Sequence, residues 1–567
     1  MFWLTRGPAG RVGQAGVPTV CWPIMAMFLV ELSKRVGRAV YRKPASIPVI
    51  FREGLAMRLA VMLIHKLGLQ AGGMTLSMLR RANMLAEQGW DARVVTTEPN
   101  ALYASVDRHY RSIGRLREGA RIQNLWDYLR DCNTPDDVVI PPLPEPPEGS
   151  YAAPTRADGR GKRFFMPHLN VYKEYWEWRE DDSLSYRDIF DDAHVRIRRL
   201  VYDERSTLWR EISYDAYGNK IRQDRFLTVD GYCYLTRWIT IQEQQVTTAL
   251  YFDRNSGSVH EFRSQTELEV WALNKLAKEG DRAPLFIGDG IGGIRTLPQV
   301  FENDAVRVMQ IHSNHFSGPR DQGGELRKDH ADVFRRANEV DRVVLLTEEQ
   351  RSDVVAEFGN ADRYAVIPHV EDARPVSGIE RDPHRVVSAT RFAPEKRLDL
   401  LVDAFAKVVR RVPKAHLVLV GDGPERAALA SRVTSHSLEE HVTFEPWSSR
   451  VDVEYAASAV SVLTSSFEGY ALSIGESLVQ GTPVVAFDVK YGPRQQLADG
   501  GGVLVPFGDV SKLAAAITTL LENPRLQRET AERGRANVFE QRSSDRVYAR
   551  WVSLVESVMA DRAGCDG

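Results

Sequence analysis

The chain is 567 residues long and carries 74 basic against 76 acidic side chains, so its formal net charge is only −2. This balance argues against a protein that binds nucleic acid through bulk charge. The length predicts roughly three or four domains of ~100–200 residues each. The four cysteines are scattered without metal-ligand spacing, which argues against a disulfide framework, so we expect a reducing, cytoplasmic setting.

Residues 1–55 do not predict a fold. The apolar run over residues 17–30 is shorter than the ~20 residues that span a bilayer, and two prolines interrupt it. Residues 31–42 form a basic amphipathic stretch, and residues 28–42 are compatible with a peripheral contact with a membrane surface. A disordered extension, or a start codon placed too early, explains the segment equally well.

The stretch that begins at Ala56 predicts a βαβ unit. An apolar strand, a turn with Gly72 and Gly73, an amphipathic helix and a second strand over residues 92–97 follow one another. Glycines in such a turn let a ligand approach the free N–H groups at the helix N-terminus, which favour an anion. Taken alone, the two glycines more often indicate a tight turn.

Residues 136–161 are rich in proline, glycine and charge, which predicts a linker. Residues 162–270 alternate aromatic and β-branched runs with turn sequences such as Asp230-Gly231, which predicts an antiparallel β-meander inserted into the first α/β domain. Exposed aromatic strands would pair with another chain or an extended acceptor. A self-contained module with its aromatic residues in its own core fits the pattern equally well.

Two histidines, His312 and His315, follow the strand predicted over residues 305–312. A histidine at this position can donate a hydrogen bond or act as acid or base near neutral pH. Lone histidines at strand ends are more often structural than catalytic, but the position of these two beyond a strand end, where ligands of α/β sheets bind, favours a functional role. The pair predicts no zinc site, because no third ligand is nearby.

The segment from Val386 to Asp509 alternates short Val/Leu-rich runs with amphipathic stretches, the pattern of a parallel α/β sheet. Arg391 and Lys396 follow one predicted strand, and Glu468 and Glu476 follow another. Ligands of open α/β sheets bind beyond the carboxyl ends of strands, so the four side chains can converge on one ligand. Two cations and two carboxylates predict a ligand that is anionic and rich in hydroxyl groups.

Motifs in both halves now carry a resemblance to a known family. GGMT, SATRFAPEKRLD, VGDGP and EGYALSIGE, with seven residues between its glutamates, resemble the retaining nucleotide-sugar glycosyltransferases of family 4, which have the GT-B fold. More narrowly, GGMTLSMLRRANML, the inserted meander, IHSNHF and FDVKYGPRQQ resemble the poly(glycerol-phosphate) and poly(ribitol-phosphate) α-glycosyltransferases of wall teichoic acid. The same architecture occurs in the catalytic subunit that glycosylates serine-rich adhesins.

The resemblance implies an α/β protein with two Rossmann-like domains that face a cleft and a β-meander inserted in the first. Together with the composition shifts it divides the chain into an N-terminal extension (1–55), the first part of the N-terminal Rossmann-like domain with its linker (56–161), the inserted meander (162–270), the second part of that domain (271–378), the donor-binding domain (379–544) and a C-terminal helix that crosses back (545–567).

The resemblance also implies a UDP-sugar donor and retention of the anomeric configuration. Arg391 and Lys396 would stabilise the charge that develops on the leaving diphosphate. Glu476 would accept hydrogen bonds from the ribose, and Glu468 would lie beside the donor sugar. His312 would contact the 6-hydroxyl of the donor sugar or the acceptor, with His315 as the substitute candidate.

Backbone N–H groups of Tyr470, Ala471 and Leu472 would bind phosphate or sugar oxygens at a helix start. Gly72 and Gly73 would face the β-phosphate from the other domain. Members of the family usually carry glycine where Ala471 stands. We expect no metal and no other cofactor, because no Asp-x-Asp pair ends a strand in either α/β half.

We therefore expect a cytoplasmic enzyme that transfers glucose or N-acetylglucosamine from a UDP-sugar to hydroxyls of a polyol-phosphate wall polymer. A peripheral position at the inner face of the membrane is compatible with this expectation. The meander predicts a homo-oligomer or a partner subunit. One alternative is a protein O-glycosyltransferase of serine-rich adhesins, with a polypeptide acceptor. Another is a non-catalytic partner or chaperone subunit, which the four intact site residues count against.

Overall fold

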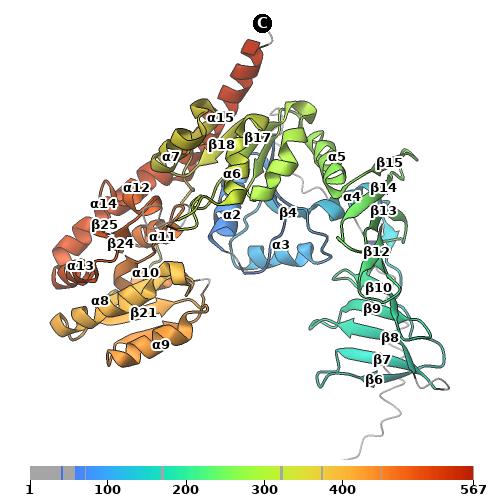
Figure 1. Cartoon of the computed structure of the whole chain (residues 1–567), viewed down its shortest axis with the longest axis horizontal. Helices are drawn as coiled ribbons and strands as arrows, with labels where there is room; N and C mark the ends of the chain where they lie inside the picture. The colour runs from blue at the N-terminus through green and yellow to red at the C-terminus, as the bar shows by residue number, and fades with distance from the viewer. Residues whose placement is uncertain are drawn as a thin grey trace, which may run out of the picture.

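The computed structural model describes residues 40–41, 58–70, 72–167, 171–318, 324–371, 374–448 and 450–565. Two parallel α/β sheets lie side by side, and a long antiparallel sheet extends from the first of them (Figure 1). The predicted extension over residues 1–55 lies outside the described residues except for β1 (Val40–Tyr41), which pairs antiparallel with β5 (Val138–Val139).

The first sheet has seven parallel strands in the order β19-β18-β17-β16-β2-β3-β4. The chain runs outward from β2 to β4, leaves for the antiparallel sheet, and returns to pair β16 with β2. The strands are β2 (Leu59–Ile64), β3 (Asp91–Thr96), β4 (Ala120–Asn124), β16 (Leu285–Gly288), β17 (Val306–Gln310), β18 (Arg342–Leu345) and β19 (Tyr364–Val366).

Both faces of this sheet are covered, because alternate residues of a strand point to opposite faces and all six residues of β2 are buried. Leu59, Val61 and Leu63 belong to one core, and their neighbours Ala60 and Met62 belong to the other. The helices of this half are α2 (Gly73–Glu87), α3 (Tyr103–Ser112), α4 (Leu125–Asn133), α5 (Gln265–Ala277), α6 (Lys328–Arg335) and α7 (Glu348–Phe358), with short 3-10 turns η1 (Ile291–Arg295), η2 (Leu297–Gln299), η3 (Glu302–Asp304), η5 (Ala337–Glu339) and η6 (Ala361–Arg363).

The antiparallel sheet has ten strands in sequential order, as a meander does. Its strands are β6 (Tyr151–Pro154), β7 (Gly161–Met166), β8 (Val171–Trp178), β9 (Leu184–Phe190), β10 (Arg196–Tyr202), β11 (Leu208–Tyr214), β12 (Ile221–Leu227), β13 (Cys233–Ile239), β14 (Val246–Phe252) and β15 (Val259–Phe262). The sheet begins before residue 162, since β6 lies within the predicted linker. That prediction is wrong there because Tyr151 stacks on Phe165, a contact that the linker composition does not reveal.

The meander is anchored in the core of the first half. The Trp126 ring of α4 stacks on Phe226 of β12 at a centroid distance of 4.8 Å, and Tyr234 and Tyr251 are fully buried in the same core. Farther out, Phe164 and Trp176 belong to a small separate cluster. The structure thus buries many of the aromatic side chains, some in a core shared with the first half and others in a small cluster of the meander's own.

The second sheet has six parallel strands in the order β22-β21-β20-β23-β24-β25. Its strands are β20 (Asp382–Ala389), β21 (His416–Val420), β22 (Val442–Glu445), β23 (Ser458–Leu463), β24 (Val484–Asp488) and β25 (Gly502–Pro506). Its helices are η7 (Pro394–Lys396), α8 (Leu398–Arg411), α9 (Arg426–Ser435), α10 (Val451–Ala457), α11 (Leu472–Val479), α12 (Gly492–Leu497), α13 (Val510–Glu522) and α14 (Pro524–Arg542).

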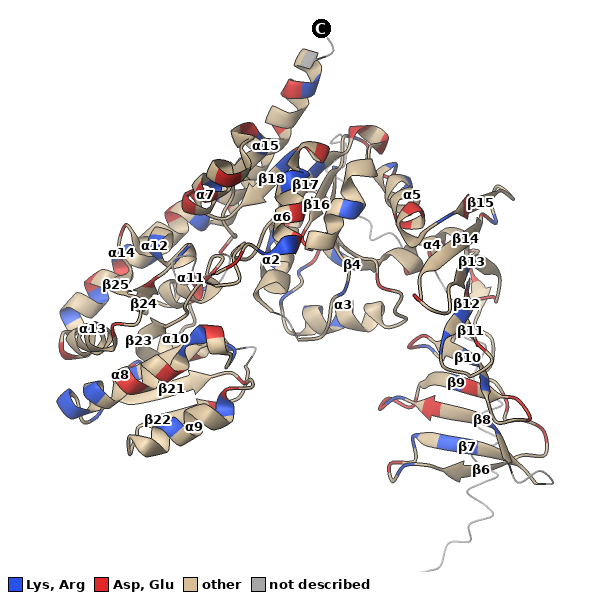
Figure 2. Ribbon diagram, viewed as in Figure 1, with Lys and Arg blue, Asp and Glu red and all other residues tan. Residues whose placement is uncertain are grey.

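The last helix, α15 (Ser544–Cys565), leaves the second sheet and packs on the first half (Figure 1). Val547, Trp551 and Leu554 belong to the core that also holds residues of α2 and α3. Among the described residues, no helix combines the length and apolar character needed to cross a membrane. Lys and Arg are interspersed with Asp and Glu over the ribbon in Figure 2, in keeping with the small net charge.

Replacing Trp551 by alanine tests whether α15 supports the first half. The side chain is 2% exposed, and the Arg81 guanidinium lies 5.4 Å from its ring centroid. Removing a buried tryptophan costs about 3–5 kcal/mol, so urea unfolding followed by fluorescence should show a clearly lower midpoint. The control is Ser553→Ala on the exposed face of the same helix, expected within about 0.5 kcal/mol of the unchanged protein. Equal midpoints for the two variants would contradict the packing.

Candidate active site

The predicted site residues follow strands at which the chain changes direction within each sheet. In the second sheet the chain runs from β20 out to β22 and then returns to place β23 beside β20. Lys396 follows β20 and Glu468 follows β23. In the first sheet the same change lies between β2, which precedes Gly73, and β16, which precedes Asp289. Ligands of α/β sheets bind at such switch points.

Lys396 and Glu468 meet although 72 residues separate them. Lys396 Nζ donates to Glu468 Oε1 at 2.7 Å, and the Ser465 hydroxyl donates to the same oxygen at 2.6 Å. Their side chains are 19% and 13% exposed, so the ion pair is mostly shielded from solvent. The Thr464 hydroxyl donates to the backbone oxygen of Lys396 at 2.9 Å and holds the two loops together.

Glu468 lies in the loop before α11. This loop touches the first half: a Cβ atom on Gly469 would lie 2.4 Å from the His312 carbonyl oxygen and 2.6 Å from the Ser313 Cα. Such distances are far below van der Waals contact, so only glycine fits. The contact brings Glu468 to the strand end of the first sheet.

The N-termini of α2 and α11 face each other across this contact. A Cβ atom on Gly73, the first residue of α2, would lie 3.3 Å from Leu472 Cδ1, at the first residue of α11. Neither Gly72 nor Ala471, the two N-cap residues, provides a side-chain hydrogen bond to its helix. Free N–H groups at helix starts favour an anion, so both helices can serve the same one.

Ala471 adopts the left-handed conformation, with φ 65° and ψ 77°. Non-glycine residues pay roughly 1–2 kcal/mol for it, which explains physically why glycine is the easier residue at this position. The Gln496 amide holds the loop by donating to the backbone oxygens of Tyr470 and, at 3.2 Å, of Ala471. The backbone therefore keeps the conformation that glycine would adopt without strain.

His312 reaches this region, and its orientation is fixed. Nε2 lies 2.8 Å from Asp289 Oδ1, and because a carboxylate only accepts, Nε2 carries the proton. Arg81 also donates to Asp289. Burial alone would raise the pKa of Asp289, but the charge of Arg81 and the hydrogen bond from His312 outweigh burial and lower that pKa. Asp289 is thus an ionised anchor for His312.

His315, the substitute candidate, lies elsewhere. It is completely buried and packs on Phe316, on Phe334 and on Tyr491, which it stacks against at 5.6 Å. A different histidine, His369, stacks on His312 at a centroid distance of 5.2 Å. Burial lowers the pKa of His369 well below its ordinary value, and the positive charges around it add to this, so it is neutral at pH 7. Sequence reasoning missed His369, although it lies shortly after the end of β19.

Ser313 was also missed, although it stands between the two predicted histidines. Its hydroxyl lies 2.9 Å from His330 Nε2, and His330 Nδ1 lies 3.0 Å from Asp329 Oδ1. Because the carboxylate accepts from Nδ1, Nε2 is the acceptor for the serine hydroxyl. Burial lowers the pKa of His330, which keeps the ring neutral. This chain of hydrogen bonds fixes the backbone that contacts Gly469.

Two predicted residues lie apart from the Lys396–Glu468 pair. Arg391 pairs with Glu395, and its side chain is 68% exposed. Glu476 lies on α11 and accepts from Arg80 of α2 at 2.9 Å. The structure therefore joins Lys396 with Glu468 directly and ties Glu476 to the first half, while Arg391 remains at the rim.

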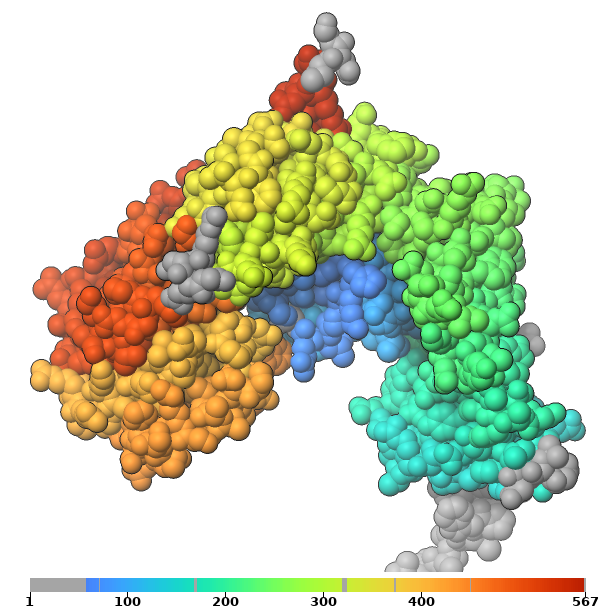
Figure 3. Space-filling model, viewed as in Figure 1, coloured from blue at the N-terminus to red at the C-terminus, as the bar shows by residue number. Residues whose placement is uncertain are grey.

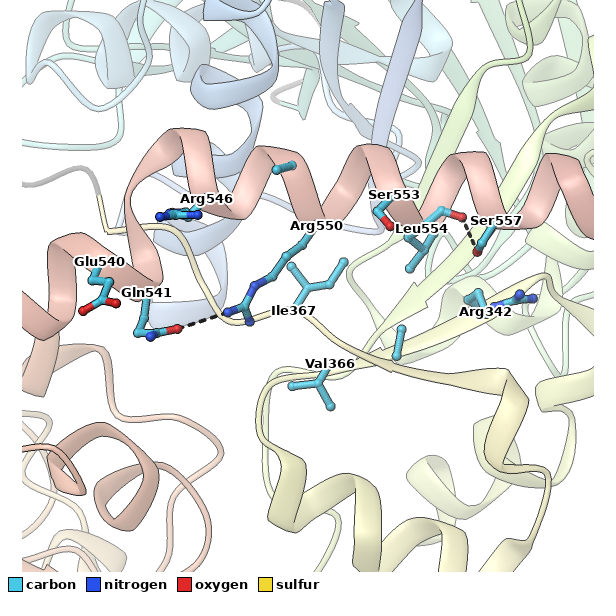
Figure 4. Close-up of a pocket in the computed structure, with 12 residues that line it drawn as sticks. Arg342, Val366, Ile367, Glu540, Gln541, Arg546, Arg550, Ser553, Leu554 and Ser557 are labelled. Carbon is cyan, nitrogen blue, oxygen red and sulfur yellow. Dashed lines mark hydrogen bonds between the residues drawn. The ribbon is translucent and has the colours of Figure 1, made fainter.

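Two further features bear on ligands. Within the described ranges, no group of three or more His, Cys, Asp or Glu side chains is placed to hold a metal ion. A groove of about 600 Å³ lies between α15 and β19. Figure 4 shows that Arg550 projects into it. Two arginines of the groove already have partners: Arg342 forms an ion pair with Asp561, and Arg550 donates a hydrogen bond to Gln541. None of the predicted site residues lines this groove.

Comparison with known proteins finds a family match in the second half and relatives over most of the chain. Residues 369–537 match the family model "Glycosyl transferases group 1". The chain is 24% identical over 509 residues to the poly(ribitol-phosphate) alpha-N-acetylglucosaminyltransferase of Staphylococcus aureus, a match that covers 88% of this chain and 100% of that protein. It is also 24% identical over 362 residues to the poly(glycerol-phosphate) alpha-glucosyltransferase of Bacillus subtilis, and the match spans 53% of that protein.

Among solved structures, a mutant of S. aureus TarM in complex with fondaparinux, alpha-GlcNAc-glycerol and UDP has a TM-score of 0.73 to this chain, at 23% identity. The match covers 88% of this chain and 99% of the TarM chain. The likeness extends over both parallel sheets and the meander, so it confirms the predicted GT-B fold. The predicted resemblance to glycosyltransferases that modify polyol-phosphate polymers is confirmed as well.

Replacing Gly469 by alanine tests the contact between the halves. The new methyl group has no room beside His312 and Ser313, so the halves must separate by a fraction of an ångström or more. Misplacement of about 1 Å can lower a rate by about 100-fold, and we expect a loss of that order in donor turnover, measured as UDP release. The control is Gly292→Ala, where a Cβ meets nothing within 4 Å. Full activity of both variants would show that the contact does not control the site.

Proposed function

We propose that this chain, whose second half is a glycosyl transferases group 1 domain, is a retaining glycosyltransferase that moves glucose or N-acetylglucosamine from a UDP-sugar to a hydroxyl of a polyol-phosphate polymer. The observation that carries the proposal is the Lys396–Glu468 pair at the switch point of the second sheet, with Glu468 in the loop that leads into α11, whose first residue lies against the first residue of α2. The names of the relatives support the class of acceptor.

The donor diphosphate fits between the two helix starts. Free N–H groups of α2 and α11 bind its oxygens, and the Lys396 ammonium offsets the charge that grows as the bond to the sugar breaks. Glu468 accepts hydrogen bonds from the donor sugar and balances the positive character of its anomeric carbon. Arg391, at the rim, swings toward the diphosphate when the donor is bound. UDP in the related TarM structure supports this choice of donor.

The acceptor enters from the side of the first half. Its hydroxyl attacks the anomeric carbon on the face that UDP leaves, which retains the configuration, and its proton passes to an oxygen of the departing phosphate. His312, held by Asp289, contacts the donor sugar or this hydroxyl. The space-filling view shows a broad hollow between the second half and the meander, with the first half above it (Figure 3). An open hollow suits a polymer better than a small acceptor.

The setting of the enzyme is part of the proposal. We place it in the cytoplasm, where UDP-sugars are made, with contact at the inner face of the membrane through residues 28–42. We also propose that the meander joins copies of the chain or a partner subunit through strands such as β6, where the Tyr151 side chain is 51% exposed. Mass measured in solution at increasing concentration tests the association.

Replacing Lys396 by methionine tests the leaving-group role. The variant keeps the apolar stem and removes the charge, so we expect the turnover number to fall by about 100- to 1,000-fold while folding is preserved. The matched control is Lys407→Met, because Lys407 is an exposed residue of α8 that donates to the Ser511 hydroxyl at 2.8 Å. Equal turnover in the two variants would remove Lys396 from the chemistry.

The decisive experiment measures UDP release from a panel of UDP-sugars, with a polyol-phosphate polymer and a Ser/Thr-rich polypeptide offered in parallel. We expect release that depends on the polymer and on one of the two sugars. Release that depends only on the polypeptide would assign the chain to protein O-glycosylation. No release above hydrolysis with either acceptor would favour a non-catalytic partner.

A further inference from the structure

Arg80 of α2 reaches out of the first half and binds two carboxylates at once. Its Nη2 donates to Glu476 Oε1 at 2.9 Å, and its Nη1 lies 3.3 Å from both oxygens of Glu371. The three side chains are 4%, 14% and 2% exposed in the order Arg80, Glu476 and Glu371. A guanidinium is suited to this position because its planar fork presents several donors at fixed angles.

Arg80 belongs to one half of the molecule and the two carboxylates belong to the other. Arg80 belongs to the first sheet's helix α2, and Glu476 lies on α11 of the second half. Glu371 lies on the segment that passes from β19 to β20, and its backbone N–H donates to the Arg542 carbonyl at 2.9 Å. Glu371 is therefore fixed to the second half's α14, and Arg80 ties both carboxylates to the first half.

Gly475 is the reason the network can approach α11 so closely. A Cβ atom at this residue would lie 2.7 Å from Glu371 Oε2 and 2.8 Å from Arg542 Nη1. Because Gly475 precedes Glu476, its bare backbone brings Glu371 and Arg542 beside the very turn of α11 that carries the donor-side carboxylate. The local charges, two arginines against two carboxylates, are balanced without the donor.

We infer that Arg80 is a positioning residue for Glu476, and that it makes recognition of the donor's ribose depend on contact between the two halves. The inference rests on the proposed function, in which Glu476 binds the ribose. Arg80 engages Oε1 of Glu476, which leaves Oε2 directed to the ribose hydroxyls. When the halves separate, Arg80 withdraws and Glu476 loses the partner that sets its rotamer. Ribose binding and closure therefore support each other.

The test measures the dissociation constants of UDP and of its dideoxyribose analogue, which lacks both ribose hydroxyls. Four proteins are compared: the unchanged protein, Arg80→Lys, Glu476→Gln and the double variant. The dissociation constant of the analogue divided by that of UDP measures how much the ribose hydroxyls contribute to binding. Lysine keeps the charge but cannot bind both carboxylates as a fork, so we expect UDP affinity to fall about tenfold while the analogue is little affected. Glu476→Gln should lower this ratio by a similar factor. The double variant should lower it little further than either single variant, because both changes disrupt the same interaction.

The control for loss of a buried arginine fork is Arg130→Lys, because Arg130 pairs with Asp203 at 2.9 Å, its side chain is 8% exposed, and it lies on α4 away from the contact. This variant should leave the ratio unchanged. Equal losses of UDP and analogue affinity in Arg80→Lys would overturn the inference, since a purely structural role predicts that result. If Glu476→Gln leaves the ratio unchanged while Lys396→Met still abolishes turnover, the ribose role fails and the proposed reaction stands.

Discussion

The backbone contact between Gly469 and His312 fixes how the two α/β halves face each other. Each sheet by itself offers only half a site: a helix N-terminus and a histidine on one side, and an ammonium–carboxylate pair on the other. The loop after β23 can contact the loop after β17 only at a residue without a Cβ atom. The glycine at position 469 therefore determines how closely the two halves approach and how their site residues are aligned. This alignment places the start of α2 against the start of α11. It also brings Arg80 within hydrogen-bond distance of Glu476.

Around that contact the site is held by anchors that are not themselves exposed to a ligand. Asp289, ionised and completely buried in its side chain, holds His312, while His330 holds Ser313. Buried groups of this kind cost free energy unless each polar atom has a partner. Here each anchor is hydrogen-bonded to its partner, so His312 and Ser313 are held in place before a substrate binds. The site therefore needs less rearrangement of its side chains during the reaction.

Sequence reasoning located the Lys396–Glu468 pair because strand ends of parallel sheets converge, a property of the fold class that needs no coordinates. It could not find Arg80, because an arginine in an amphipathic helix has the pattern of a solvated face until a second half of the chain covers it. Asp289 escaped for a related reason: its partner Arg81 lies 208 residues away. The strand β6 was missed since four residues with one aromatic side chain carry too little periodicity to separate a strand from a linker.

The path of α15 has a consequence for how the protein is made. The core of the first half is assembled from β2 and α2 near the start, β16 to β19 beyond the meander, and Trp551 and its neighbours on α15. The ribosome releases these pieces in that order, with the whole second sheet synthesised before the last piece emerges. The second half can fold on the ribosome from a continuous stretch of chain, while the first half exposes apolar surface until α15 has been synthesised. The part of the protein that is translated first therefore completes its folding last.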